Sequence, residues 1–148
     1  IILLDSGPLG LVTSPKVNAD ARECSLWLER IMVSDHLAAI PEIVDYELRR
    51  ELLRGRKSRA LLTLDSLALR MLFLPISTPV MRQAAEFWAV ARQHGVATAD
   101  DRALDADVIL AAQARFIEET WQQEVVIATA NVRHLARFAT ARKWRDVP

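Results

Sequence analysis

The stretch Ile1-Ile2-Leu3-Leu4-Asp5-Ser6-Gly7-Pro8 begins the chain and predicts its fold. Four aliphatic residues followed by turn-forming residues are typical of a short strand buried on both faces, as in the middle of a parallel sheet. Asp5 stands where this strand ends. Ligands of open α/β sheets bind outside the carboxyl ends of the strands, so Asp5 is placed for chemistry or metal binding. The alternative is that Asp5 caps the helix that follows.

Strand and helix signals alternate along the rest of the chain. Further strands are expected over 37–40, 74–76 and 124–129, with an edge strand over 144–147. Helices are expected over 7–14, 19–33, 42–54, 57–73, 78–94, 105–122 and 132–138, with a loop over 96–104. Strands that alternate with helices predict an α/β fold, with a parallel sheet covered by helices on both faces.

The composition is that of an ordinary globular protein. The chain has 148 residues, of which 51% are hydrophobic and 26% are charged, and we expect a single domain over 1–148. Its one cysteine, Cys24, excludes an internal disulfide and fits a reducing compartment. No apolar run approaches the roughly 20 residues that cross a bilayer, and no signal peptide is recognisable. We therefore expect a soluble cytoplasmic protein that does not associate with membranes.

Charge is balanced overall but unevenly distributed. The formal net charge is zero, while basic residues gather in 49–59 and 133–145 and acidic residues gather in 100–107. Basic flanks around an acidic centre can attract a polyanion and still hold a cation. The alternative is that these blocks are solvated helix faces.

Glu47 is an acidic residue that we expect to point inward. It lies three or four residues after Ile43 and Val44, at the margin of the apolar side of the helix expected over 42–54. An inward carboxylate near a sheet is costly unless it is paired or binds a cation. The alternative is a salt bridge to an arginine of the same domain.

Two more oxygen-bearing residues begin helices or follow strands. Asp107 lies in the first turn of the helix expected over 105–122, where the helix dipole favours a negative group, and Asp105 is the better candidate for the cap. Asn131 follows the strand over 124–129. If that strand lies beside the first, Asn131 and Asp5 open onto the same crevice; the alternative is that Asn131 caps the last helix.

The side chains of Asp5, Glu47, Asp107 and Asn131 together suit a hard divalent cation. Without a cation, three neighbouring carboxylates would repel one another and take up a proton. With Mg²⁺ or Mn²⁺, such a site could activate a water and offset charge that builds on a phosphate. The sequence therefore predicts metal-assisted hydrolysis of phosphodiesters. Other chemistries fit less well, since the three histidines lack metal-ligand spacing and no glycine-rich phosphate loop is present.

The helix expected over 57–73 is apolar on more than one side. Its leucines are Leu61, Leu62, Leu64, Leu67, Leu69 and Leu72. A helix of this kind is either fully buried or packs against a second chain, and in so small a domain we favour a partner or dimer surface.

The order of these residues resembles the PIN domain, and within it the VapC-type ribonuclease toxins of bacterial toxin–antitoxin pairs. The resemblance spans nearly the whole chain and is carried by the segments 3–9, 46–50, 107–114 and 126–135. Its most specific features are the helix that begins with Asp107 and runs into Ala111-Ala112, and the strand end Thr129-Ala130-Asn131.

The resemblance implies that Asp5 and Asp107 bind Mg²⁺ and that Glu47 completes the acidic cluster. Many family members have a fourth acid where this chain has Asn131, and Asp105 could compensate for it. The resemblance further implies a three-layer α/β/α fold with a five-stranded parallel sheet, a homodimer, a small VapB-like antitoxin, and RNA substrates that are often transfer RNA.

We therefore expect a Mg²⁺-dependent endoribonuclease with Asp5, Glu47 and Asp107 as its catalytic residues. The RNA backbone is expected to contact Arg49, Arg50, Arg133 and His134. One rival is a phosphatase of the haloacid dehalogenase type, but that chemistry needs a second Asp where this chain has Gly7. Another is a catalytically silent RNA-binding or regulatory module with the same fold.

Overall fold

The computed structural model describes residues 1–16, 18–93 and 101–148, the side chains of 101–104 excepted. Within these residues five strands form one sheet in the order β3-β2-β1-β4-β5, and every neighbouring pair is parallel. The strands are β1 (Ile2–Leu4), β2 (Ala38–Pro41), β3 (Leu72–Leu74), β4 (Val126–Thr129) and β5 (Ala141–Lys143). The expected five-stranded parallel sheet is therefore confirmed.

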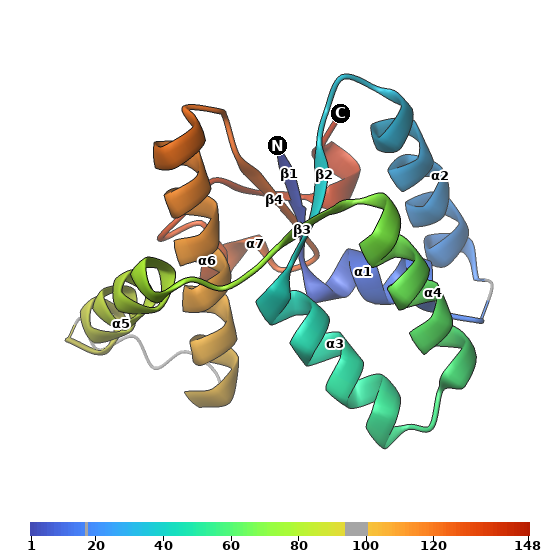
Figure 1. Cartoon of the computed structure of the whole chain (residues 1–148), viewed down its shortest axis with the longest axis horizontal. Helices are drawn as coiled ribbons and strands as arrows, with labels where there is room; N and C mark the ends of the chain where they lie inside the picture. The colour runs from blue at the N-terminus through green and yellow to red at the C-terminus, as the bar shows by residue number, and fades with distance from the viewer. Residues whose placement is uncertain (17, 94–100) are drawn as a thin grey trace.

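Helices flank the sheet on both sides, as Figure 1 shows. To its right in that view lie α1 (Ser6–Thr13), α2 (Ala19–Val33), α3 (Glu42–Arg54) and α4 (Ser58–Arg70). To its left lie α5 (Thr78–Gln93), α6 (Asp101–Trp121) and α7 (Val132–Leu135). A short 3-10 helix, η1 (Trp144–Asp146), follows β5. In the described part of the chain, no helix has the length and apolarity required to span a membrane.

The first strand is the centre of the fold. β1 pairs with β2 on one side and with β4 on the other, and Leu3 and Leu4 are fully buried. Each such leucine contributes about 1.5–3 kcal/mol by leaving water. All strands run in the same direction, so the residues that follow β1, β2 and β4 meet at one edge of the sheet, the lower end of β1 in Figure 1.

Several expected boundaries are wrong. The third strand covers Leu72–Leu74 instead of 74–76, because Pro75 has no N–H with which to continue the ladder to β2. The last strand is Ala141–Lys143, whereas the edge strand expected over 144–147 is largely the 3-10 helix η1. There Trp144 is buried with its ring centroid 5.7 Å from that of Trp27.

Other boundaries shift by a few residues. Helix α6 begins at Asp101 instead of 105, so residues 101–104 of the expected loop are helical. The rest of that loop, residues 96–100, lies outside the described residues. The fourth strand starts at Val126 instead of 124, and α7 ends at Leu135 instead of 138.

Helix α4 is buried on one side only. Leu64 and Leu67 belong to the core, whereas the side chains of Leu62 and Leu69 are 69% and 89% exposed. The expectation that the helix is apolar on two sides is confirmed, and one of those sides has no covering within the described residues.

Candidate active site

Asp5 follows the central strand and is held on both of its carboxylate oxygens. Its backbone N–H donates to the Ala128 carbonyl at 3.0 Å, which continues the β1–β4 ladder by one residue. Its Oδ1 accepts from the Ser6 backbone N–H at 2.6 Å, and its Oδ2 accepts from Thr129 Oγ1 at 2.6 Å. The capping alternative is confirmed, since Asp5 is the N-cap of α1. Oδ1 also accepts from the Ser6 hydroxyl at 3.3 Å, so within the described residues one lone pair of the carboxylate, on Oδ2, accepts no hydrogen bond.

Thr129 is a site residue that the sequence analysis missed. It ends β4, is completely buried, and its hydroxyl donates to Asp5 while accepting the backbone N–H of Asn131 at 2.9 Å. Gly7 allows α1 to lie close to the residue that follows β4, because a Cβ added at Gly7 would lie only 3.2 Å from the Cβ of Ala130. The available signal was a hydroxyl residue at the end of an otherwise apolar buried strand.

Glu47 reaches the same edge from α3, which begins directly after β2. Its side chain is 23% exposed. Burial raises the pKa of the Glu47 carboxyl, and the negative charges of Asp5 and, more weakly, Asp107 raise it further. Arg50 opposes this shift, but its Nη2 is 3.8 Å from Glu47 Oε1, too far for a hydrogen bond. The alternative of a salt bridge is therefore met only by this long ion pair between Arg50 and Glu47.

Asp107 completes the acidic group from α6. The pKa of its carboxyl is raised first by burial and also by the charge of Asp5, whereas His134 lowers it. The His134 Nδ1 lies 3.2 Å from Asp107 Oδ2. Because α6 begins at Asp101, Asp107 lies in the second turn, and our placement of it in the first turn is wrong.

The structure thus brings Asp5 near enough to Glu47 and Asp107 for its charge to raise the pKa of both, and Asp107 near enough to raise the pKa of Glu47. Burial is the first cause of the raised pKa of Glu47 and of Asp107, and the negative charge of Asp5 adds to it, so a cation at this site would relieve both effects. Oxygen donors with excess negative charge fit Mg²⁺ or Mn²⁺. Among the described residues, however, no three His, Cys, Asp or Glu side chains are already arranged to hold a metal ion. Metal binding therefore stays a prediction.

Asn131 and Asp105 are both exposed, and their expected part in metal binding stays a prediction. Asn131 is exposed and precedes α7, but its side chain makes no capping hydrogen bond, so the capping alternative is wrong. Asp105 does not cap α6 either, because that helix starts at Asp101. It is exposed and lines a groove between α5 and α6 with Met81. Residues two apart on a helix point roughly 200° apart, which explains why Asp105 and Asp107 face different neighbours.

The residues that we expected to contact RNA are in different situations. The guanidinium of Arg49 donates to both oxygens of Asp45, at 2.8 and 2.9 Å, and lies 2.8 Å from Asp65, so it joins α3 to α4. This pairing gives Arg49 a structural role, and its expected contact with RNA stays a prediction. Arg50 and Arg133 are exposed. His134 lies against Asp107.

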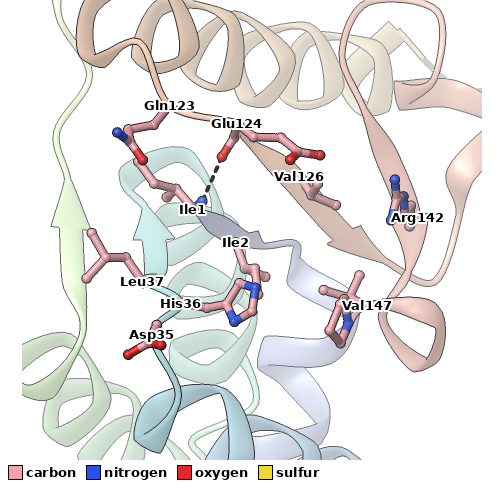
Figure 2. Close-up of a pocket in the computed structure, with 11 residues that line it drawn as sticks. Ile1, Ile2, Asp35, His36, Leu37, Gln123, Glu124, Val126, Arg142 and Val147 are labelled. Carbon is pink, nitrogen blue, oxygen red and sulfur yellow. Dashed lines mark hydrogen bonds between the residues drawn. The ribbon is translucent and has the colours of Figure 1, made fainter.

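A separate pocket, drawn in Figure 2, lies beside the amino end of β1, at the end of the sheet away from the acidic site. Its volume is about 380 Å³, and Ile1, Ile2, His36 and Arg142 are among its lining residues. The amino group of Ile1 donates to the Glu124 carbonyl at 2.7 Å beside it. Because Ile2 begins the central strand and Asp5 follows its end, this pocket is not part of the acidic site.

The comparisons with known proteins show the fold. No protein-family model and no curated protein matches the chain. A chain of the VapBC2 complex of Rickettsia felis, bound to a promoter DNA fragment, matches with a TM-score of 0.71 and 18% identity, over 97% of this chain and 98% of that one. A chain of FitAcB from Neisseria gonorrhoeae matches with a TM-score of 0.63 and 23% identity, over 99% and 100%.

A chain of DNA-bound VapBC from Salmonella typhimurium also matches, with a TM-score of 0.63 and 17% identity, over 97% of both chains. At these identities the likeness establishes architecture alone. The chain has the fold found in VapBC and FitAcB complexes, and the PIN-like architecture expected from the sequence is confirmed.

Proposed function

We propose that this chain is a metal-dependent endoribonuclease, the toxin component of a VapBC-type toxin–antitoxin pair. The observation that supports it is the convergence of Asp5, Glu47 and Asp107, from three separate elements, at the carboxyl edge of the sheet. That edge is where α/β sheets of this kind bind ligands.

The three acids would hold the cation, Mg²⁺ or alternatively Mn²⁺. Within the described part of the chain, Asp5 retains one free lone pair on Oδ2, one oxygen of Asp107 has no hydrogen bond, and Glu47 has only the long contact with Arg50. When bound, such an ion supplies positive charge against the developing phosphate charge and makes a coordinated water more acidic. The chain itself contributes the spacing of the carboxylates and their partial exclusion from water.

RNA is the proposed substrate, with transfer RNA as one candidate. Arg50, which lies 3.8 Å from Glu47, and Arg133, which precedes His134 in the chain, are exposed. Guanidinium groups bind phosphate oxygens through paired N–H donors and fix the backbone without reading its sequence. They would hold the strand across the site while Asp5, Glu47 and Asp107 act on one phosphodiester.

Cleavage of labelled RNA by the purified chain tests the nuclease. We expect cleavage in Mg²⁺, none in excess chelator, and recovery when Mg²⁺ is returned. Asp5→Asn keeps one oxygen for the Ser6 N–H, but it places an NH2 group where Oδ2 accepts from Thr129 and it loses the charge, so cleavage should fall well below that of the unaltered chain. Asp35→Asn, an exposed aspartate beside the pocket of Figure 2, is the matched control and should cleave normally.

Equal cleavage by the Asp5→Asn variant and the unaltered chain would refute the proposed site. RNA that is bound but never cut would instead favour the alternative function, a catalytically silent RNA-binding or regulatory module. The absence of a preformed metal arrangement among the described residues and the amide at Asn131 are the observations in its favour.

A homodimer formed through α4 is part of the proposal. Leu62 and Leu69 are exposed on that helix, and a dimer would bury them. Leu69→Asp is expected to convert a dimer to a monomer in light scattering after size-exclusion chromatography. Leu26→Asp, at an exposed leucine of α2, should leave the dimer intact. A monomeric unaltered chain would contradict this assembly.

The second proposed partner is a small antitoxin like VapB. The gene beside this one is expected to encode a small DNA-binding protein that copurifies with the chain and inhibits RNA cleavage. A neighbouring product that neither binds nor inhibits would remove the support for a toxin role while leaving the nuclease proposal intact.

A further inference from the structure

The short segment 129–134 contacts two of the three acids. At its start, the Thr129 hydroxyl donates to Asp5 Oδ2 at 2.6 Å. At its end, the Nδ1 of His134 lies 3.2 Å from Asp107 Oδ2. Between them, the backbone N–H of Asn131 donates to Thr129 Oγ1 at 2.9 Å, which ties the segment to its own first residue. One segment therefore links the two aspartates from outside the acidic group.

The segment is itself firmly held. Thr129 is fully buried at the end of β4, and Leu135, next to His134, is buried in the core. The Leu135 carbonyl accepts the backbone N–H groups of Phe138 and Ala139, at 3.0 and 3.1 Å. His134 belongs to α7, and its side chain is 31% exposed with Nδ1 against Asp107. A histidine anchored in this way can fix the position of the group it contacts.

Asp107 needs such a contact because the negative charge of Asp5 acts on it from within the site. Two partly buried carboxylates repel each other. A hydrogen-bond donor is therefore needed to keep the Asp107 carboxylate turned toward Asp5. His134 is the one hydrogen-bond partner of the Asp107 carboxylate found in the described residues. In metal sites, partners of this kind orient the ligands and set the affinity.

We propose that His134 is a positioning residue, whose Nδ1–H donates to Asp107 Oδ2 and holds that carboxylate at the spacing from Asp5 that a divalent cation requires. The role rests on the proposed metal-dependent function. It replaces our expectation that His134 contacts the RNA backbone, and it needs only the neutral tautomer that carries its proton on Nδ1.

Calorimetric titration of the chain with Mn²⁺ alone tests this role without measuring catalysis. His134→Ala removes the donor and should weaken Mn²⁺ binding about 10–100-fold. His134→Asn keeps an N–H donor near the position of Nδ1 and should recover most of the affinity. His36→Ala and His36→Asn, at a histidine of the opposite edge, are matched controls that should bind as the unaltered chain does.

The outcomes separate this role from the proposed function. Unchanged or tighter Mn²⁺ binding by His134→Ala would overturn the positioning role while leaving the metal site in place. Equal weakening by His134→Ala and His134→Asn would also overturn it, because the donor would then be irrelevant. If the unaltered chain does not bind Mn²⁺, both the proposed function and the role of His134 fail.

Discussion

Glu47→Gln is expected to make the metal-free chain more stable while slowing RNA cleavage by about 10²–10³-fold, the usual effect of removing one electrostatic group from an active site. The gain in stability should be about 1 kcal/mol, within the range for removal of an unfavourable charge, and should raise the Tm by roughly 2–4 °C in chelator. Its cause is the burial of Glu47 near Asp5 and Asp107.

The sign of this effect depends on pH. The pKa of Glu47 is raised in the folded state above its ordinary value of 4.5. Between these two values the folded chain binds a proton that the unfolded chain has lost, so the free energy of unfolding falls as pH rises through the window. Above the folded pKa the destabilisation is complete. The stability advantage of Glu47→Gln should therefore be largest at neutral pH and vanish below the ordinary pKa.

Mg²⁺ should reverse the order of the two proteins. A ligand present at 100 times its Kd stabilises the folded state by about 2.7 kcal/mol, more than the expected gain from Glu47→Gln. Thermal unfolding in chelator and in Mg²⁺ measures both effects. If the unaltered chain melts above Glu47→Gln in chelator as well, the carboxylate of Glu47 is compensated in the folded protein and the proposed excess charge is absent.

Glu51→Gln is the matched control on the same helix. Glu51 pairs with Arg54 at 2.6 Å, is exposed, and has a pKa lowered chiefly by its hydrogen bond with that arginine. Its replacement should change neither the response to Mg²⁺ nor cleavage. Equal effects of Glu47→Gln and Glu51→Gln would mean that a general loss of charge is responsible.

The architecture could be predicted from local signals. The apolar run in 1–4 and the apolar residues of β4 each gave a strand buried on both faces, and such strands occur in parallel sheets. The ends of the helices and strands were harder to predict, because they depend on which strands pair in the fold. Leu72 and Phe73 continue the helical pattern of α4, yet they pair with Ala39 and Ile40 of β2. Tertiary pairing decided that segment.

The acidic site could be predicted only where local sequence patterns fix the direction of a side chain. Asp5 and Glu47 follow or face buried elements whose patterns are visible in the sequence, so their direction could be inferred. Asp105 could not be separated from Asp107 without the true start of α6. The contacts of Thr129 and His134 join residues 124 and 27 positions apart along the chain, and no periodic pattern reports contacts of that kind.

Thr129→Val is expected to destabilise the chain and to weaken its metal site together. Valine has nearly the shape of threonine, so the packing is preserved, but Asp5 Oδ2 loses a donor and the Asn131 N–H loses its acceptor. Buried polar groups without partners cost about 1–3 kcal/mol, and these two contacts are partly buried, so we expect a loss of about 1 kcal/mol. At roughly 2–4 °C per kcal/mol in a chain of this size, the loss is visible in a thermal melt. Mn²⁺ titration should show weaker binding, because Asp5 is no longer held.

Two variants show whether the hydroxyl of Thr129 is responsible. Thr129→Ser keeps it and loses one buried methyl, about 1 kcal/mol, so Mn²⁺ binding should persist. Thr13→Val removes another buried hydroxyl, which donates to the Leu9 carbonyl at 2.9 Å, and should lower stability without affecting Mn²⁺. If Thr129→Val binds Mn²⁺ like the unaltered chain, Asp5 keeps its place without Thr129. Thr129 would then serve stability alone, because the carboxylate of Asp5 would be positioned by its N-cap contact with α1.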